Sequence, residues 1–404
     1  MKPGILFLTI GTLAIGTDLF IIGGILPYVA EAFSISDSVA GYIVTVFAIS
    51  YAVIGPLAAL KTKLIPKRSL LLLSMAIFIV GELFSAISSS FGVLLIARII
   101  AAVGASVYTP VTFAVAVMLV PDEKRGRALS LVSGGLIISM AIAVPMGTWI
   151  SLLFGWRFTY LFIAVIGIIA ETGLFFVLEK TPGNRLHSMP EGVYSSLFYP
   201  KFLAATLSYA FWGMAIFSIF PFLSLIITGN LHLQPFDVGY ILMFFGAGSF
   251  IGLIFGGYTT DRFGHGRTTK ISVLLSIMAA ILSWILLMDN SPLFIASYFL
   301  FGMVMQAYMP SQLRRIILIS EEKVHQIALS INNSMLYTGL ALGAVVGGVI
   351  LKHFSVTQLP AISVVFISLT LILSVFSWGS QKPSLISRQN MNNCHTSHQS
   401  NLDK

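Results

Sequence analysis

The stretch ILFLTIGTLAIGTDLFIIGGILPYVA, residues 5–30, decides the class of fold. Asp18 is its single charged residue, and the stretch exceeds the roughly 20 apolar residues that a helix needs to cross a bilayer. It is too long for a cleaved signal peptide and has no small-residue cleavage site, so we expect it to be retained as a first membrane span.

The rest of the chain has the same character. Of its 404 residues, 57% are hydrophobic and 9% are charged, and its mean hydropathy is +0.94. A soluble domain carries about 25% charged residues, so this composition excludes a soluble enzyme, a soluble nucleic-acid-binding protein and a disordered scaffold. The apolar runs are continuous rather than alternating, which predicts an all-α membrane protein rather than a barrel.

Twelve apolar runs predict twelve transmembrane helices. Their ranges are 5–30, 39–60, 69–88, 92–119, 128–153, 158–178, 202–228, 237–258, 271–288, 293–315, 327–351 and 359–379. We expect the following parts: an N-terminal six-helix half at 1–179, a cytoplasmic linker at 180–201, a C-terminal six-helix half at 202–379, and a disordered cytoplasmic tail at 380–404.

The basic residues predict the orientation. With the N-terminus in the cytoplasm, all 23 Lys and Arg residues except Arg98, Arg157 and Lys352 fall in cytoplasmic segments. This asymmetry follows the positive-inside rule, so we expect a multi-pass protein of the cell (plasma or inner) membrane with both termini cytoplasmic. The net charge of +8 is then a topology signal and predicts no nucleic-acid partner.

No pattern predicts an enzyme, a cofactor or a metal site. Cys394 is the single cysteine, which excludes an intramolecular disulfide. With His395 and His398 it has the spacing of metal ligands, but the surrounding tail has the composition of a disordered segment. No histidine is paired with Cys, Asp or Glu within a span.

A weak internal repeat divides the chain. Ala-Leu-Ser at 128–130 recurs at 328–330, and Gly147 recurs as Gly347, both at an offset of 200 residues. We interpret this as two pseudo-symmetric six-span halves, an arrangement that places a substrate site near mid-membrane between them.

Four segments resemble motifs of the major facilitator superfamily, in particular of its twelve-span drug:proton antiporter branch. GYTTDRFGHGR at 257–267 resembles the G-x-x-x-D-R-x-G-R cytoplasmic loop. Glycines there permit a tight turn, and Asp261 is suited to cap a neighbouring helix and to pair with a basic residue. The predicted cytoplasmic latch comprises Gly257, Asp261, Arg262, Gly264 and Arg267. The first-half copy at 55–61 has Leu60 near the place of the aspartate.

The other three segments lie within spans. Arg98 and Gly104 resemble the R-x-x-Q-G-x-G motif of span four, with alanines in place of the glutamine and the first glycine. Pro145 and Gly147, followed by Gly-Trp-Arg at 155–157, resemble the fifth-span antiporter motif of sugar-efflux, purine-efflux and chloramphenicol exporters. The segment 16–27 resembles the first span of the branch, which carries an acidic residue within the membrane. The resemblance implies the major facilitator fold.

Away from the span ends, four charged residues lie within predicted spans, at a cost of roughly 2.5–3.5 kcal/mol each. Asp18, in the middle of span one, is the predicted proton site. Arg98 is predicted to pair with Asp18 or to act on it electrostatically, so these two residues are the predicted proton-coupling pair. Glu82 and Glu171 lie in spans three and six, which the resemblance implies are peripheral, and we expect them to be structural.

The resemblance also implies a cavity lined by spans one, two, four and five and their second-half counterparts. The substrate cavity candidates are Tyr51, Tyr108, Tyr209, Trp212, Gln306, Asn332, Asn333 and Tyr337. Gly339, Gly343 and Gly347 form a small-residue ridge in span eleven, where we expect the halves to move against each other.

These observations favour a proton-coupled secondary efflux transporter, an antiporter that exports a small organic compound by alternating access. The expected substrate is a drug, a nucleobase or nucleoside, or a sugar-like molecule, and the expected state is a monomer in the lipid bilayer without a cofactor. Two alternatives are a proton-coupled importer or uniporter of a small metabolite and a non-transporting membrane receptor.

Overall fold

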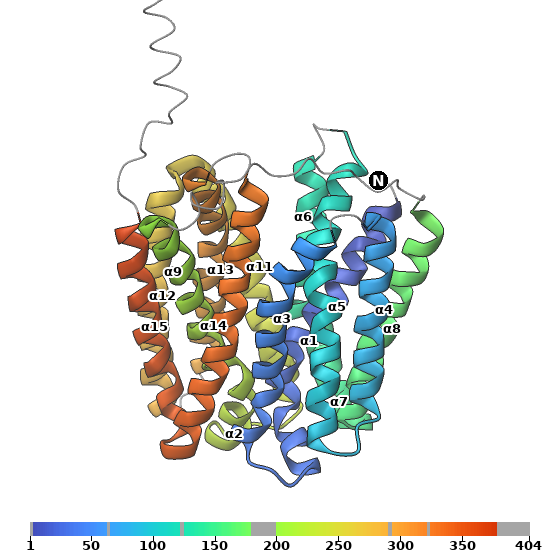
Figure 1. Cartoon of the computed structure of the whole chain (residues 1–404). Coiled ribbons are helices and arrows are strands. Elements are labelled where there is room, and N and C mark those ends of the chain that lie inside the picture. Colours follow the sequence, from blue (N-terminus) through green and yellow to red (C-terminus); the bar gives the residue numbers. More distant parts are fainter. Residues whose placement is uncertain are drawn as a thin grey trace, which may run out of the picture.

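A computed structural model describes residues 3–62, 65–121, 125–178, 199–289, 293–320 and 324–377, and two groups of helices lie side by side in it (Figure 1). The first group comprises α1 (Pro3–Ala32), α2 (Asp37–Ala40), α3 (Tyr42–Lys61), α4 (Lys67–Ala86), α5 (Phe91–Met118), α6 (Arg125–Ile138), the π-turn η2 (Ser139–Ala143), α7 (Val144–Phe154) and α8 (Trp156–Val177).

The second group begins with α9 (Pro200–Phe217), the 3₁₀ turn η4 (Phe220–Phe222), α10 (Leu223–Leu225) and the π-turn η5 (Ile226–Asn230). It continues with α11 (Asp237–Phe263), α12 (His265–Met288), α13 (Phe294–Ile319), α14 (His325–His353), the 3₁₀ turn η7 (Val356–Gln358) and α15 (Leu359–Phe376). The predicted linker and tail lie almost entirely outside the described residues.

Within the described residues, eleven helical segments are long and apolar enough to cross a membrane. The 26-residue α13 is a further long helix of the same bundle, and its polar residues, among them Gln306, Gln312 and Arg315, lower its hydropathy. The prediction of an all-helical, multi-span protein is confirmed.

Two predicted spans are not continuous α-helices, and proline accounts for both breaks. Pro145 has no N–H to donate to the carbonyl of Ala141, and the chain widens into η2 just before it. The predicted span 202–228 is wrong as a single helix because α9 ends before Pro221 and the chain continues through η4, α10 and η5.

The two halves meet in the middle of the bundle and toward the face opposite the N-terminus. Near that opposite face, Ser38 Oγ donates to the Gly348 carbonyl at 2.7 Å, and Trp149 Nε1 donates to the Phe236 carbonyl at 3.1 Å. Each of these bonds joins one half to the other. Helices α3 and α14 run alongside each other at the centre of Figure 1. In this conformation the opposite face is therefore held closed.

The small-residue ridge of α14 does not face the other half, so the expectation that the halves move against each other there is wrong. Gly339, Gly343 and Gly347 lie directly against the α9 backbone of their own half. The next glycine, Gly348, approaches the first half instead, at Ser38. The sequence shows that the ridge is on one helix face, and the packing decides which neighbour that face meets.

Candidate functional site

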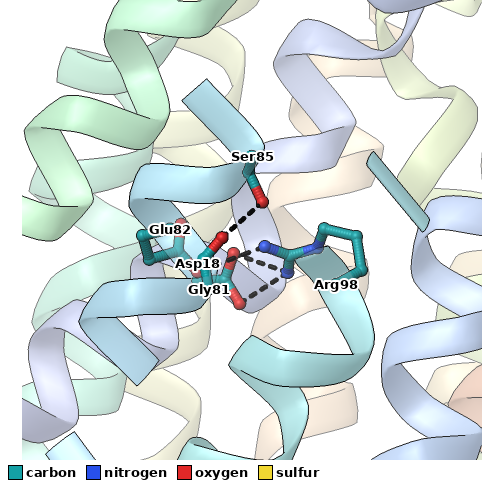
Figure 2. A network of polar contacts seen from close by, with 5 residues as sticks. All are labelled: Asp18, Gly81, Glu82, Ser85 and Arg98. Atoms are coloured by element: carbon teal, nitrogen blue, oxygen red, sulfur yellow. Dashed lines mark hydrogen bonds and ion pairs between the residues drawn. The ribbon is translucent and has the colours of Figure 1, made fainter. Parts of the chain in front are cut away.

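A buried ion cluster lies inside the first half, where the Arg98 guanidinium contacts two carboxylates (Figure 2). Arg98 Nη2 lies 2.6 Å from both carboxylate oxygens of Asp18, and Arg98 Nη1 lies 3.2 Å from Glu82 Oε1. Asp18 and Arg98 are each 3% exposed, and Glu82 is fully buried. We call these three residues the ion cluster.

Close helix packing brings the cluster together. A Cβ added at Gly81 of α4 would lie 2.6 Å from the Ala101 Cα of α5, so only a glycine allows the two helices to approach this closely. Gly104 packs in the same way against Phe78. Glu82 follows Gly81 directly, and the close approach turns its carboxylate toward Arg98. Ala101, where the family motif has glutamine, supplies the small surface that Gly81 requires.

Aromatic rings enclose the guanidinium. The Arg98 Cζ lies 4.8 Å from the ring centre of Phe47 and 5.4 Å from that of Tyr160, which are cation–π distances. A cavity of about 10 Å³ lies beside Asp18, Arg98 and Tyr160. This volume is close to the minimum that one water molecule requires.

The structure thus answers one question that sequence left open, because Asp18 and Arg98 are in contact. Glu82 was expected to be structural and peripheral, yet it contacts the same guanidinium. The sequence feature that could have indicated this contact of Glu82 is the pair of small residues Gly81 and Ala101. That feature becomes informative only once α4 and α5 are known to touch. Glu171 stays outside the cluster, partly exposed on α8.

The substrate cavity candidates fall into separate groups. Tyr51 of α3 and Tyr337 of α14 stack across the two halves, with ring centres 3.5 Å apart and an interplanar angle of 12°. Asn333 lies one turn before Tyr337 on α14. Tyr51 and Tyr337 are therefore the candidates that the structure brings to the interface between the halves, with Asn333 beside them in the sequence of α14.

The remaining candidates lie within one half. Tyr209 and Trp212 stack inside the second half with ring centres 5.4 Å apart. Asn332 is buried and accepts a hydrogen bond from Gln312, and Gln306 is partly buried. Tyr108 packs against Gly11 of α1 within the first half.

A second buried cation, Arg315, lies in the other half. The sequence places Arg315 at the cytoplasmic end of the span predicted at 293–315, but α13 continues to Ile319 and Arg315 is only 2% exposed. Its guanidinium donates to neutral acceptors on three helices, including Ser208 Oγ at 2.7 Å, Ser377 Oγ at 3.0 Å and Gln312 Oε1. Among the described residues, no carboxylate forms an ion pair with it.

The predicted cytoplasmic latch lies on the surface at the end of α11. Asp261 accepts a hydrogen bond from Arg314 of α13 at 2.9 Å, which is the basic partner that the sequence predicts. Its side chain is 82% exposed and caps no helix N-terminus among the described helices, so the capping part of the prediction is wrong. Gly264 has φ = 83°, which is the turn conformation expected of that glycine.

The other latch residues make few contacts in this structure. Arg262 donates to the Tyr258 hydroxyl, and Arg267 is exposed. A Cβ at Gly257 would touch nothing within 4 Å. The side chain of Leu60 in the first-half copy lies outside the described residues, so the two copies are not comparable at that position.

The predicted antiporter motif packs against the helix that carries Asp18. Gly147 lies against Ile21 of α1, and a neighbouring contact joins Gly16 of α1 to Ser139 of η2. On its other side, η2 touches Gly246 of α11 through its Met140 backbone. The motif segment is therefore in contact both with the helix of the ion cluster and with the second half.

Comparisons with known proteins give one consistent family. A family model described as Major Facilitator Superfamily matches residues 8–220 and 202–392. The chain is 28% identical over 383 residues to the inner membrane transport protein YdhP of Escherichia coli strain K12, covering 95% of this chain and 97% of that protein. It is 31% identical over 261 residues to the chloramphenicol resistance protein of Streptomyces lividans, covering 63% and 66% respectively.

Two solved structures have the same fold. A D-xylose–proton symporter matches with a TM-score of 0.78 and 14% identity, covering 93% of this chain and 96% of the symporter. A bacterial homologue of the human lysosomal transporter Spinster, in an inward-facing and unoccupied conformation, matches with a TM-score of 0.71 and 18% identity, covering 93% and 95%. At these identities the similarity supports the fold alone, and it confirms the fold class that the sequence predicts.

Proposed function

Because this chain belongs to the major facilitator superfamily, and is therefore a multi-pass secondary transporter of small molecules and not an enzyme, we propose that it is a proton-coupled exporter. In this proposal, protons move inward through the ion cluster while a small organic compound moves outward. The compound is drug-like, a nucleobase or nucleoside, or sugar-like.

The buried contact between Asp18 and Arg98 is the observation that carries the proposal. An ionised carboxylate in the middle of a membrane span is costly, and such residues mark ion and proton pathways in membrane proteins. Asp18 has both features that a proton site requires: a carboxylate that gains and loses charge, and a cation in contact that responds to the change.

Coupling follows from the position of Asp18 on α1. When Asp18 takes up a proton, its attraction to Arg98 weakens, and α1 becomes free to shift relative to α5. Since α1 packs on η2 and η2 touches Gly246 of the second half, a shift of α1 reaches the interface between the halves. Protonation then favours one access state of the transporter over the other, as alternating access requires.

The direction of transport rests on two weaker observations. The fifth-span segment around Pro145 resembles an antiporter motif, and a relative with 31% identity is named a chloramphenicol resistance protein. Both favour export. With the predicted orientation, the closed opposite face is the outer side.

The substrate in this proposal binds between the halves. Tyr51 and Tyr337 fill the centre of that interface in the present conformation. Separating the two rings would expose aromatic walls beside the Asn333 amide, which suits a moderately apolar molecule with few hydrogen-bonding groups.

An accumulation screen in cells tests the proposal. Cells that lack this protein are compared with cells that produce it, across drugs, purines and sugars, with and without an uncoupler. We expect at least one compound to accumulate less when the protein is present, and the uncoupler to remove the difference. Greater accumulation would support the importer alternative instead, and no change with any compound would favour a non-transporting receptor.

A further inference from the structure

The ion cluster contains more negative charge than its single cation balances. Arg98 carries one positive charge, and fully ionised Asp18 and Glu82 together carry two negative charges. The Tyr160 ring of α8 also lies against the guanidinium, and it carries no formal charge in its neutral form. Among the described residues, no second cation forms an ion pair with either carboxylate. A buried net charge is strongly unfavourable, so the cluster is balanced when it holds one proton.

The contacts indicate how that proton is distributed. Asp18 has the closer contact with Arg98, at 2.6 Å against 3.2 Å for Glu82. Glu82 Oε2 is buried without a hydrogen-bond partner, and Asp18 and Glu82 contact the two terminal nitrogens of the same guanidinium. Two buried carboxyl groups that face one cation are expected to share one proton, because ionisation of both would leave a net negative charge.

We propose that Asp18 and Glu82 form one two-carboxylate proton site around Arg98, and that Glu82 serves as the alternative partner of the guanidinium. The inference rests on the proposed function and extends it to Glu82. When the proton lies on Glu82, Arg98 pairs with Asp18, and when it lies on Asp18, Arg98 pairs with Glu82. The arginine is thus never left without a counter-charge while Asp18 is protonated.

This arrangement has a consequence that a single-carboxylate site does not share. Either Asp18→Asn or Glu82→Gln leaves one carboxylate and one guanidinium, which balance without a proton. Each single variant should therefore empty the site of its proton, although the substituted residue differs. If the proton belonged to Asp18 alone, Glu82→Gln would leave it in place.

Infrared spectroscopy of the purified full-length protein in lipid nanodiscs at neutral pH measures the protonation of the cluster directly. A protonated carboxyl absorbs at a different frequency from a carboxylate. The measurements use an E171Q background, since Glu171 is a further carboxyl in the middle part of a predicted span and is outside the cluster. We expect one equivalent of protonated carboxyl in that background and none after adding either Asp18→Asn or Glu82→Gln. A protonated carboxyl that persists in the Glu82→Gln protein, or is absent from the parent protein, would overturn the proposal.

Thermal stability gives a second readout that needs no substrate. The double variant Asp18→Asn/Glu82→Gln leaves Arg98 buried without a counter-charge, whereas each single variant keeps one. We expect the midpoint of thermal unfolding to fall further for the double variant than the sum of the two single changes. Additive changes would contradict the shared-partner role of Glu82. Failure of the proposed function looks different, because the infrared result would hold while no compound is exported.

Discussion

The contact between α4 and α5 can be disturbed by one methyl group. In Gly81→Ala, the new Cβ would lie 2.6 Å from Ala101 Cα and closer still to Ala101 N, whereas ordinary contacts begin at 3.4 Å. The helices must therefore part by about 1 Å at this point, if the neighbouring backbone does not yield. Glu82 is the next residue, and a displacement of this size would lengthen its 3.2 Å contact with Arg98 beyond the range of an ion pair.

The expected cost follows from two opposing effects. Overpacking of this kind costs about 1–3 kcal/mol. Replacing a helical glycine by alanine stabilises the folded protein by up to about 1 kcal/mol through helix propensity. We therefore expect Gly81→Ala to destabilise the protein by about 1–2 kcal/mol. It should also weaken proton coupling, because Glu82 is displaced from the guanidinium.

Gly92→Ala is the matched control. Gly92 lies in the first turn of α5, and a Cβ there would meet nothing within 4 Å. The assay heats each purified protein in detergent and measures the fraction that remains monodisperse by size-exclusion chromatography. The midpoint for Gly81→Ala should fall by a few degrees, and that for Gly92→Ala should stay level or rise. Equal midpoints for the two variants would refute the packing argument.

Two further predictions concern the second half and the contact between halves. Arg315→Gln removes charged hydrogen bonds that join three helices and should cost about 2 kcal/mol or more, whereas Arg314→Gln breaks an exposed ion pair worth about 0–1 kcal/mol. Thermal midpoints check this, and a midpoint for Arg315→Gln no lower than for Arg314→Gln would contradict it. The second prediction uses the double variant Ser38→Cys/Gly348→Cys in a Cys394→Ser background. Oxidation should cross-link the closed face and stop export, and reduction should restore export. Full export by the cross-linked protein would refute the gating role of this contact.

Much of the fold follows from the sequence because lipid imposes a strict rule on it. A backbone that crosses a bilayer must satisfy its hydrogen bonds internally, so long apolar runs such as residues 5–30 have one structural solution. The breaks at Pro145 and Pro221 are less predictable. A proline in a transmembrane helix is tolerated when neighbouring helices compensate, and only the packed structure shows whether a kink, a π-turn or a complete break results.

The ion cluster is predictable in part. Asp18 and Arg98 stand out because a charge within an apolar run is costly and requires a partner. Their contact joins residues 80 positions apart, and no local pattern encodes it. Glu82 has the same signal, yet its role depends on the rotation of α4 that Gly81 permits. Arg315 was missed for another reason, since the apolar run predicts that the span ends at residue 315, whereas α13 continues to Ile319.

Proton movement in reconstituted vesicles tests the central claim most directly. The purified protein is placed in proteoliposomes with a pH-sensitive dye inside, and a compound identified by the accumulation screen is added. For wild-type protein, we predict a proton flux that depends on the compound and runs opposite to it. Asp18→Asn protein, incorporated to the same level, should give no such flux. Undiminished compound-dependent proton flux in the Asp18→Asn protein would contradict the account.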